Sequence, residues 1–246
     1  MKLPFLSTIF GILIFSWAGL SNAHAQAVLR ITEVMSSSGS GGTADWFEVT
    51  NYGTAAADIT DFKMDDNSPF SSALAVALSG VTTIAPGESV IFVESAAPVT
   101  DLPAFRTFWG LAGSAQVGSY TGSGVSFGSG GDGAAIFNAA NTLVSSVTFG
   151  PATAGRSFYY VYNSAGTILS TGSPVSNSGF VGAFESAGTP LNVGSPGVFT
   201  DRVDLAFTSG INRFAKTGAV YSSLVTFQKR DGGDVATLSI VSGPAW

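Results

Sequence analysis

Apolar and polar residues alternate along much of the chain, with the two-residue period of half-buried strands. Residues 28–34 and 46–50 show the pattern first. Further candidate strands, rich in apolar, β-branched and aromatic residues, lie at residues 73–81, 89–94, 134–137, 143–149 and 157–162. Turn sequences such as Ala85-Pro86-Gly87 separate these segments. Short strands with frequent turns predict an all-β fold, an antiparallel sandwich or barrel.

Two regions depart from this alternation. Residues 102–111 carry Phe105, Phe108 and Trp109 but no convincing capping residues, which predicts a short helix or none. Residues 170–196 are rich in Ser, Gly and Pro, which predicts a long surface loop with an edge strand at 180–184. Gly194-Ser195-Pro196-Gly197 has the composition of a linker. After it, strand patterns return at residues 202–207, 220–227 and 235–241.

The first 25 residues have the organisation of an export signal. Lys2 precedes a mostly apolar run over residues 3–20, and Ala23-His24-Ala25 is a small-x-small cleavage pattern. A retained membrane anchor is the alternative, but Ser and Thr interrupt the run. We therefore expect a cleaved signal peptide and an extracellular, cell-surface or periplasmic protein. No later stretch predicts a membrane span after cleavage.

Composition narrows the possible functions. The chain has 246 residues, 45% hydrophobic and 11% charged, with no Cys, one His and a net charge of −6. Disordered chains show the opposite balance, and the absence of Cys excludes a disulfide scaffold or a Cys-based zinc site. The negative charge argues against a nucleic-acid partner. Since His24 lies in the signal segment, the exported chain has no imidazole or thiol for catalysis.

An ordered series of motifs spans residues 27–197. It runs Ile31-Thr32-Glu33-Val34, Asp45-Trp46-Phe47-Glu48-Val49-Thr50-Asn51, Asp58-Ile59-Thr60-Asp61-Phe62, Ala85-Pro86-Gly87-Glu88, Gly130-Gly131-Asp132-Gly133 and Leu143-Val144-Ser145-Ser146-Val147. This series resembles a bacterial lamin tail domain. Thr32 stands where Asn is usual in that family, and Asp61 where Gly is usual.

The resemblance implies an immunoglobulin-like antiparallel β-sandwich, and it brings no catalytic constellation with it. The strand pattern agrees, because alternating residues can fill the inward faces of two sheets. We expect this core to contain Trp46, Phe47, Val49, Ile91, Val93, Ile136, Val147 and Phe149.

A second resemblance covers residues 203–246. Gly218-Ala219-Val220-Tyr221, Asp231-Gly232-Gly233-Asp234 and Ser242-Gly243-Pro244-Ala245-Trp246 are similar to the first half of a cadherin-like, immunoglobulin-like module of bacterial surface proteins. The alternative is a chance match in a strand-rich tail. Lys229-Arg230 stand where that family has acidic residues, which weakens any inherited calcium site.

Two short motifs resemble catalytic or cofactor sites. Gly124-Val125-Ser126-Phe127-Gly128 fits a nucleophile elbow, but that site needs a general base, normally His. Gly128-Ser129-Gly130-Gly131-Asp132-Gly133 fits a dinucleotide loop, but a strand rather than a helix is predicted after it. Both are expected to be ordinary loops.

Carboxylates supply the remaining candidate chemistry. Asp65 and Asp66, with Asp61 close in sequence, could bind calcium, although Asp is also an ordinary turn residue. Glu33, Asp45 and Glu48 could mimic a glycosidase pair; we expect instead that the two glutamates accept backbone N–H groups or face solvent. The aromatic residues at 105–109 could form a sugar- or partner-binding patch, and core packing is the expected alternative.

These observations predict a signal peptide at 1–25, a lamin-tail-like β-sandwich at 27–197 and a partial second module at 198–246. The expected function is a non-catalytic structural or adhesive module of a cell-surface or secreted protein. The alternative is an accessory domain of an exported hydrolase whose catalytic domain is absent from this chain. The expected partner is an unidentified surface protein or polysaccharide, and no cofactor other than calcium is implied.

Overall fold

A computed structural model describes residues 25–39, 42–66, 69–163, 166–170 and 172–198, and two paired strands, β14 (Ala206–Phe207) and β15 (Phe227–Gln228). Within these residues the chain is mostly β, with one helix. The all-β fold class is therefore confirmed. The predicted signal peptide lies outside the described residues except for Ala25. The predicted second module also lies outside them, except for Val198, β14 and β15.

The larger sheet has the strand order β11-β1-β2-β7-β8. Its members are β1 (Leu29–Met35), β2 (Trp46–Asn51), β7 (Ser89–Glu94), β8 (Val117–Tyr120) and β11 (Phe158–Tyr159). Neighbouring strands are antiparallel except for β7 and β8, which are parallel. Parallel neighbours need a crossover connection, and α1 (Pro98–Trp109) provides it. The predicted antiparallel sandwich is confirmed, and β7 with β8 is a parallel pair at its edge.

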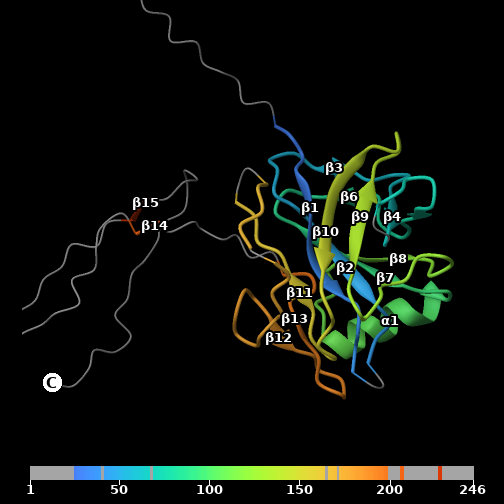
Figure 1. Ribbon diagram of the computed structural model, residues 1–246, viewed down its shortest axis with the longest axis vertical. Helices are drawn as coiled ribbons and strands as arrows, with labels where there is room; N and C mark the ends of the chain where they lie inside the picture. Colours follow the sequence, from blue (N-terminus) through green and yellow to red (C-terminus); the bar gives the residue numbers. More distant parts are fainter. Residues whose placement is uncertain are drawn as a thin grey trace, which may run out of the picture.

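The second sheet packs against the first, as the two layers in Figure 1 show, and has the order β10-β9-β4-β5. Its strands are β4 (Lys63–Asp65), β5 (Val76–Ala77), β9 (Asp132–Phe137) and β10 (Leu143–Phe149). Two further pairs are β3 (Ala57–Asp58) with β6 (Thr83–Ile84), and β12 (Phe184–Glu185) with β13 (Val193–Gly194).

All eight predicted core residues are buried, but they belong to two clusters. Phe47, Val49, Ile136, Val147 and Phe149 lie in the core between the two sheets. Trp46, Ile91 and Val93 pack instead with Phe105 and Trp109 of α1. Successive residues of a strand point to opposite faces, so one strand serves both clusters. The larger sheet is therefore covered on both faces, by the second sheet and by α1.

Helix α1 is longer than the sequence predicts and begins earlier. Pro98 occupies its first turn, and Gly110 caps its C-terminus in the left-handed conformation, with φ of 66°. Both are favoured end residues of helices. Phe105 and Trp109, four residues apart, are buried on one side, which confirms core packing for them. Phe108 is half-buried and contacts Trp109 edge to face.

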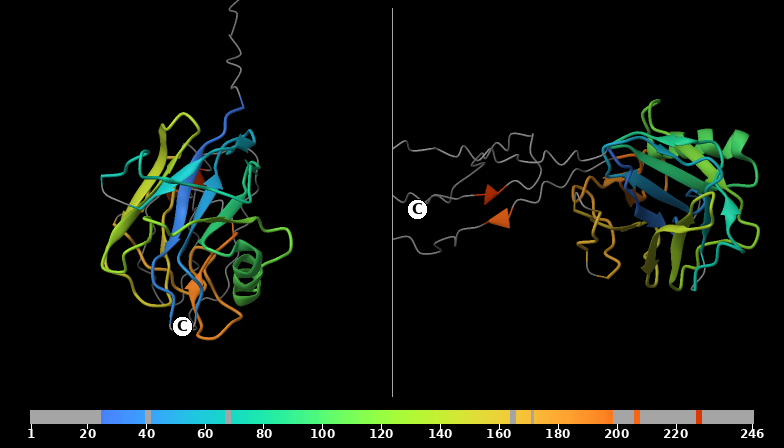
Figure 2. Two further views of the ribbon diagram at one scale, coloured as in Figure 1. Left: turned by 90° about the vertical axis from the view of Figure 1, so that its right-hand side faces the viewer. Right: turned by 90° about the horizontal axis from the view of Figure 1, so that it is seen from above.

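Some strands are shorter than predicted. Residues 73–81 contribute only β5 and a bridge at Ser79, and residues 157–162 only β11 and a bridge at Tyr162. The predicted edge strand at 180–184 is β12, shifted toward its C-terminal end. Figures 1 and 2 place β12 and β13 beside α1 at one end of the sandwich. The Gly188 backbone N–H donates to the Phe108 carbonyl at 2.8 Å, so this segment is packed against the helix.

Candidate functional site

Two buried glutamates face each other across β1 and β2. Glu33 and Glu48 are direct cross-strand partners, with 0% and 2% of their surfaces exposed. The register shifts between Ile31 and Glu33, so Thr32 is an extra residue in β1. Such a bulge turns consecutive side chains toward one region. It explains how both Thr32 and Glu33 contribute to the same polar cluster.

Glu33 accepts hydrogen bonds from two segments that are distant in sequence. The backbone N–H of Ser195 donates to its Oε1 at 2.7 Å, and the Ser195 hydroxyl donates to Oε2 at 2.9 Å. The Ser157 hydroxyl also donates to Oε1, and it shares a 2.7 Å hydrogen bond with Ser176. Both carboxylate oxygens of Glu33 are thus used by the fold.

Glu48 is bound in the same way. The backbone N–H of Gly197 donates to Oε2 at 2.7 Å, and the Thr32 hydroxyl donates to Oε1 at 2.6 Å. A row of hydroxyls continues from Thr32 to Thr50 at 2.8 Å and on to Ser89 at 2.6 Å. The prediction that the two glutamates accept backbone N–H groups is confirmed, and the alternative that they face solvent is wrong.

The segment that covers the pair is residues 194–198, which we call the strap. The sequence predicts a linker here, within a long surface loop, and that prediction is wrong. Ser195 and Pro196 are buried, and Gly197 has φ of 76°, a left-handed conformation that suits glycine. A Cβ on Gly194 would lie 2.8 Å from Glu33 Oε1 and 3.1 Å from Trp109 Cη2. Glycine therefore lets the strap lie directly on the acid pair and on α1.

Burial favours the protonated forms of both carboxyls. Desolvation raises the pKa of Glu33 to about 7, although the hydrogen bonds from Ser157 and Ser195 lower it. Desolvation, and then repulsion from Glu33, raises the pKa of Glu48 to about 8. The two titrate as a pair, and the pair holds protons well above the ordinary range of glutamate.

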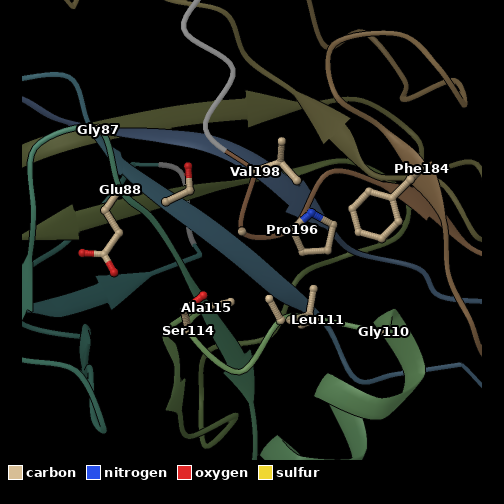
Figure 3. A pocket seen from close by; sticks show the side chains of 12 residues that line it. Gly87, Glu88, Gly110, Leu111, Ser114, Ala115, Phe184, Pro196 and Val198 are labelled. Atoms are coloured by element: carbon tan, nitrogen blue, oxygen red, sulfur yellow. The ribbon is translucent and has the colours of Figure 1, made fainter.

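A groove of about 450 Å³ adjoins the strap. Figure 3 shows Glu88 on one wall, Leu111 and Ala115 below, and Pro196 and Val198 opposite. Glu88 is itself engaged, since it accepts from the Ala85 backbone N–H at 2.7 Å and from Gln116 at 2.8 Å. The groove is open, and Glu88 is the one acidic or basic side chain among the described residues that line it.

The third predicted acid, Asp45, lies elsewhere. Burial, and then repulsion from Glu94, raises its pKa to about 7. Burial also raises the pKa of Glu94 and of Asp66. Burial, and then repulsion from Glu94, Asp45 and Asp66, raises the pKa of buried Tyr120 well above its usual value. The structure thus separates Asp45 from the Glu33–Glu48 pair.

The predicted calcium residues are distributed over different roles. Asp61 is exposed with φ of 61°, a turn conformation. Asp65 is buried and accepts from the Ser71 backbone N–H at 2.6 Å, and Asp66 accepts from the backbone N–H of Ser126. In the described part of the chain, no three acidic or His side chains are placed to hold a metal ion. Calcium binding by these residues stays a prediction.

The two Gly-rich motifs form loops between strands. Residues 124–128 connect β8 to β9, with Val125 and Phe127 buried in the core and Ser126 exposed. Residues 128–133 lead into β9, so a strand follows the motif, as expected from the sequence. The helix N-terminus required by a dinucleotide site is missing at this point of the described chain.

None of the helical segments in the described residues has the length and apolar character needed to span a bilayer.

The partners of the acid pair are what the sequence analysis missed. Ser157, Ser195 and Gly197 lie more than 100 residues from the glutamates they bind. Their Ser- and Gly-rich surroundings give no local signal of such a role. Strand alternation does place Glu48 on the same face of β2 as Trp46, and this was the available hint that Glu48 is buried.

Comparison with known proteins agrees with this architecture. The Lamin Tail Domain family matches residues 22–151. The matched residues contain Glu33 and Glu48, whereas the strap lies beyond them. No family match covers residues 203–246, so the cadherin-like module stays a prediction. Neither the curated proteins nor the solved structures give a match. With more than half of its length matched and a two-layered β fold in the described residues, the chain belongs to the lamin tail domain family.

Proposed function

We propose that the chain is a non-catalytic structural or adhesive module of an exported, cell-surface or secreted protein. The observation that carries this proposal is the hydrogen bonding of the buried acid pair. All four carboxylate oxygens of Glu33 and Glu48 accept hydrogen bonds from the chain's own hydroxyl and backbone groups. The pair thus serves to close the sandwich.

A glycosidase would need a different arrangement. Its two carboxyls flank a sugar, and one of them must reach the glycosidic oxygen while the other reaches the anomeric carbon or a water. Here the strap covers both carboxyls, and both are almost completely buried. Ser126, the other candidate, is exposed in a loop, and the one His of the chain is His24, in the predicted signal peptide. A serine without a base is a poor nucleophile.

The cations of the described residues support a partner other than nucleic acid. Arg30, Arg106 and Arg156 each donate to a backbone carbonyl, at 2.7, 2.6 and 2.8 Å respectively. Lys63 donates to the Asn141 side chain at 3.0 Å. A nucleic-acid surface needs clustered cations that are free to meet phosphates. A protein or polysaccharide on a cell surface is the proposed partner.

The proposal is tested by locating the chain and assaying it for turnover. The complete reading frame is expressed in a bacterium, and intact cells and culture medium are probed with an antibody. The purified chain is then assayed on glycoside, ester and peptide substrates. We expect export and no turnover above that of the Glu33→Gln/Glu48→Gln double variant. Turnover that this variant loses, while a Glu185→Gln control keeps it, would overturn the proposal. Retention of the chain in the cytoplasm would remove the exported role.

A further inference from the structure

The strap is attached through the acid pair and, at Gly194, through the pairing of β13 with β12. Three of its hydrogen bonds reach the glutamates: two from Ser195 to Glu33 and one from Gly197 to Glu48. Val198, the last residue before the undescribed stretch, is exposed. The glutamates themselves are held more firmly. They belong to β1 and β2, which pair along their whole length and are flanked by β11 and β7. Of the segments that enclose the two carboxyls, the strap is therefore easier to displace than β1 or β2.

In the described residues, no positively charged side chain balances the negative charge that the two glutamates would carry when ionised. The groups that donate to the carboxyls are hydroxyls and backbone amides, with no Lys or Arg among the donors in the described residues. Other titratable groups on the packed elements are Tyr52, Tyr159 and Tyr160, which line the cavity beside Glu48, Glu185 on β12 and Glu88 before β7. The cations of the neighbouring elements, Arg30, Arg106 and Arg156, are turned to carbonyl oxygens. Two ionised carboxylates here would repel each other without a countercharge.

We propose that the strap is a proton-dependent latch, closed over the protonated acid pair and released when the pair ionises. Opening admits water to both carboxylates, which relieves the desolvation and the repulsion together. Glu48 lines a small cavity of about 20 Å³ with Thr32, Thr50 and three tyrosines, and the exposed Val198 also borders it.

The direction of the response follows from linkage. In the open state the glutamates are solvated and have ordinary pKa values, whereas in the closed state the pKa values are raised to about 7 and about 8. The closed state thus binds more protons. It is favoured fully at pH values below the ordinary range of glutamate, near 4.5. Opening increases as pH rises from there to about 8, and it levels off at higher pH.

Hydrogen exchange of the complete chain tests the latch. Deuterium uptake of the peptide that contains Ser195 and Gly197 is measured by mass spectrometry from pH 5 to pH 9, with correction for the intrinsic exchange rate. We expect protection of this peptide to fall at least tenfold between pH 5 and pH 8. A peptide from β10, in the other sheet, serves as an internal reference and should change much less.

Variants separate the latch from a general loss of structure. Glu48→Gln and the Glu33→Gln/Glu48→Gln double variant should flatten the pH dependence of strap protection, while Glu185→Gln should behave as the wild type. Gly194→Ala places a methyl group 2.8 Å from Glu33 Oε1 and should open the strap at every pH. Wild-type protection that is constant from pH 5 to pH 8 would overturn the proposal even if a variant fails to fold. A pH dependence that persists in a folded double variant would do the same.

Discussion

Replacement of Trp46 by Ala tests the second core cluster, which joins α1 to the larger sheet. Trp46 is fully buried, and its ring meets Phe105 and Trp109 edge to face, with centroid distances of 5.8 and 5.6 Å. A buried indole removes up to about 250 Å² from water, which gives an upper estimate of about 6 kcal/mol. Each aromatic contact adds on the order of 1 kcal/mol.

One contribution makes the expected loss of stability smaller than this estimate. The Trp46 Nε1–H is buried and has no hydrogen-bond partner among the described residues, so its removal relieves a desolvation cost of about 1–3 kcal/mol. We therefore expect Trp46→Ala to lower the free energy of unfolding by about 3–5 kcal/mol, the range of large aromatic truncations.

The assay is urea unfolding followed by circular dichroism, with the slope of the transition compared between proteins. Leu74, which is 63% exposed, provides the control, and Leu74→Ala should change the free energy by less than about 0.5 kcal/mol. A loss below about 1 kcal/mol for Trp46→Ala would refute the packing of α1 on this face of the sheet.

Further predictions concern a polar anchor, a charge and a metal. Asn51 is fully buried and joins the backbone of Val28, Gly53, Ala55 and Ile84, so Asn51→Ala should cost about 3 kcal/mol in urea unfolding. Since the pKa of Asp45 is raised to about 7, Asp45→Asn should stabilise the protein at pH 8 but not at pH 5. If Asp61, Asp65 and Asp66 bind calcium, a chelator should lower the melting temperature, and an unchanged transition would remove that prediction.

Strand alternation predicted the most regular parts of the fold. Residues 89–94 and 143–149 form β7 and β10 with the predicted bounds; β10 alternates between buried and more exposed positions, whereas β7 is buried on both faces. The predicted core residues were correct for a related reason, since large apolar side chains seldom stay exposed. Their division between two clusters was not predictable from one strand, because β2 is buried on both faces.

The helix was underestimated because its apolar stripe is narrow. Phe105 and Trp109 are the fully buried residues of α1, so the helical period is weak. The end signals were present at Pro98, ahead of the segment where apolar residues concentrate, and at Gly110, near the end of that segment. In this helix the end residues therefore indicate the true length better than the apolar period does.

The linker prediction for the strap was wrong because its composition is compatible with two different structures. Gly, Ser and Pro predict a flexible linker, yet Ser and Gly also supply backbone N–H groups, and Gly is small and tolerates a left-handed turn. Gly197 and Ser195 use these properties to bind Glu48 and Glu33. Such pairing between distant segments depends on the folded topology, which local sequence patterns do not contain.

The central claim is that the Glu33–Glu48 pair is sealed inside the sandwich and is structural. The most direct test is the free energy of unfolding of the wild type and of the Glu33→Gln/Glu48→Gln variant, measured in urea from pH 5 to pH 8. Since the pKa values of the pair are raised to about 7 and about 8, wild-type stability relative to the variant should fall by a few kcal/mol over this range. A relative stability that stays level or rises with pH would mean that the carboxylates are open to water, and it would contradict the account.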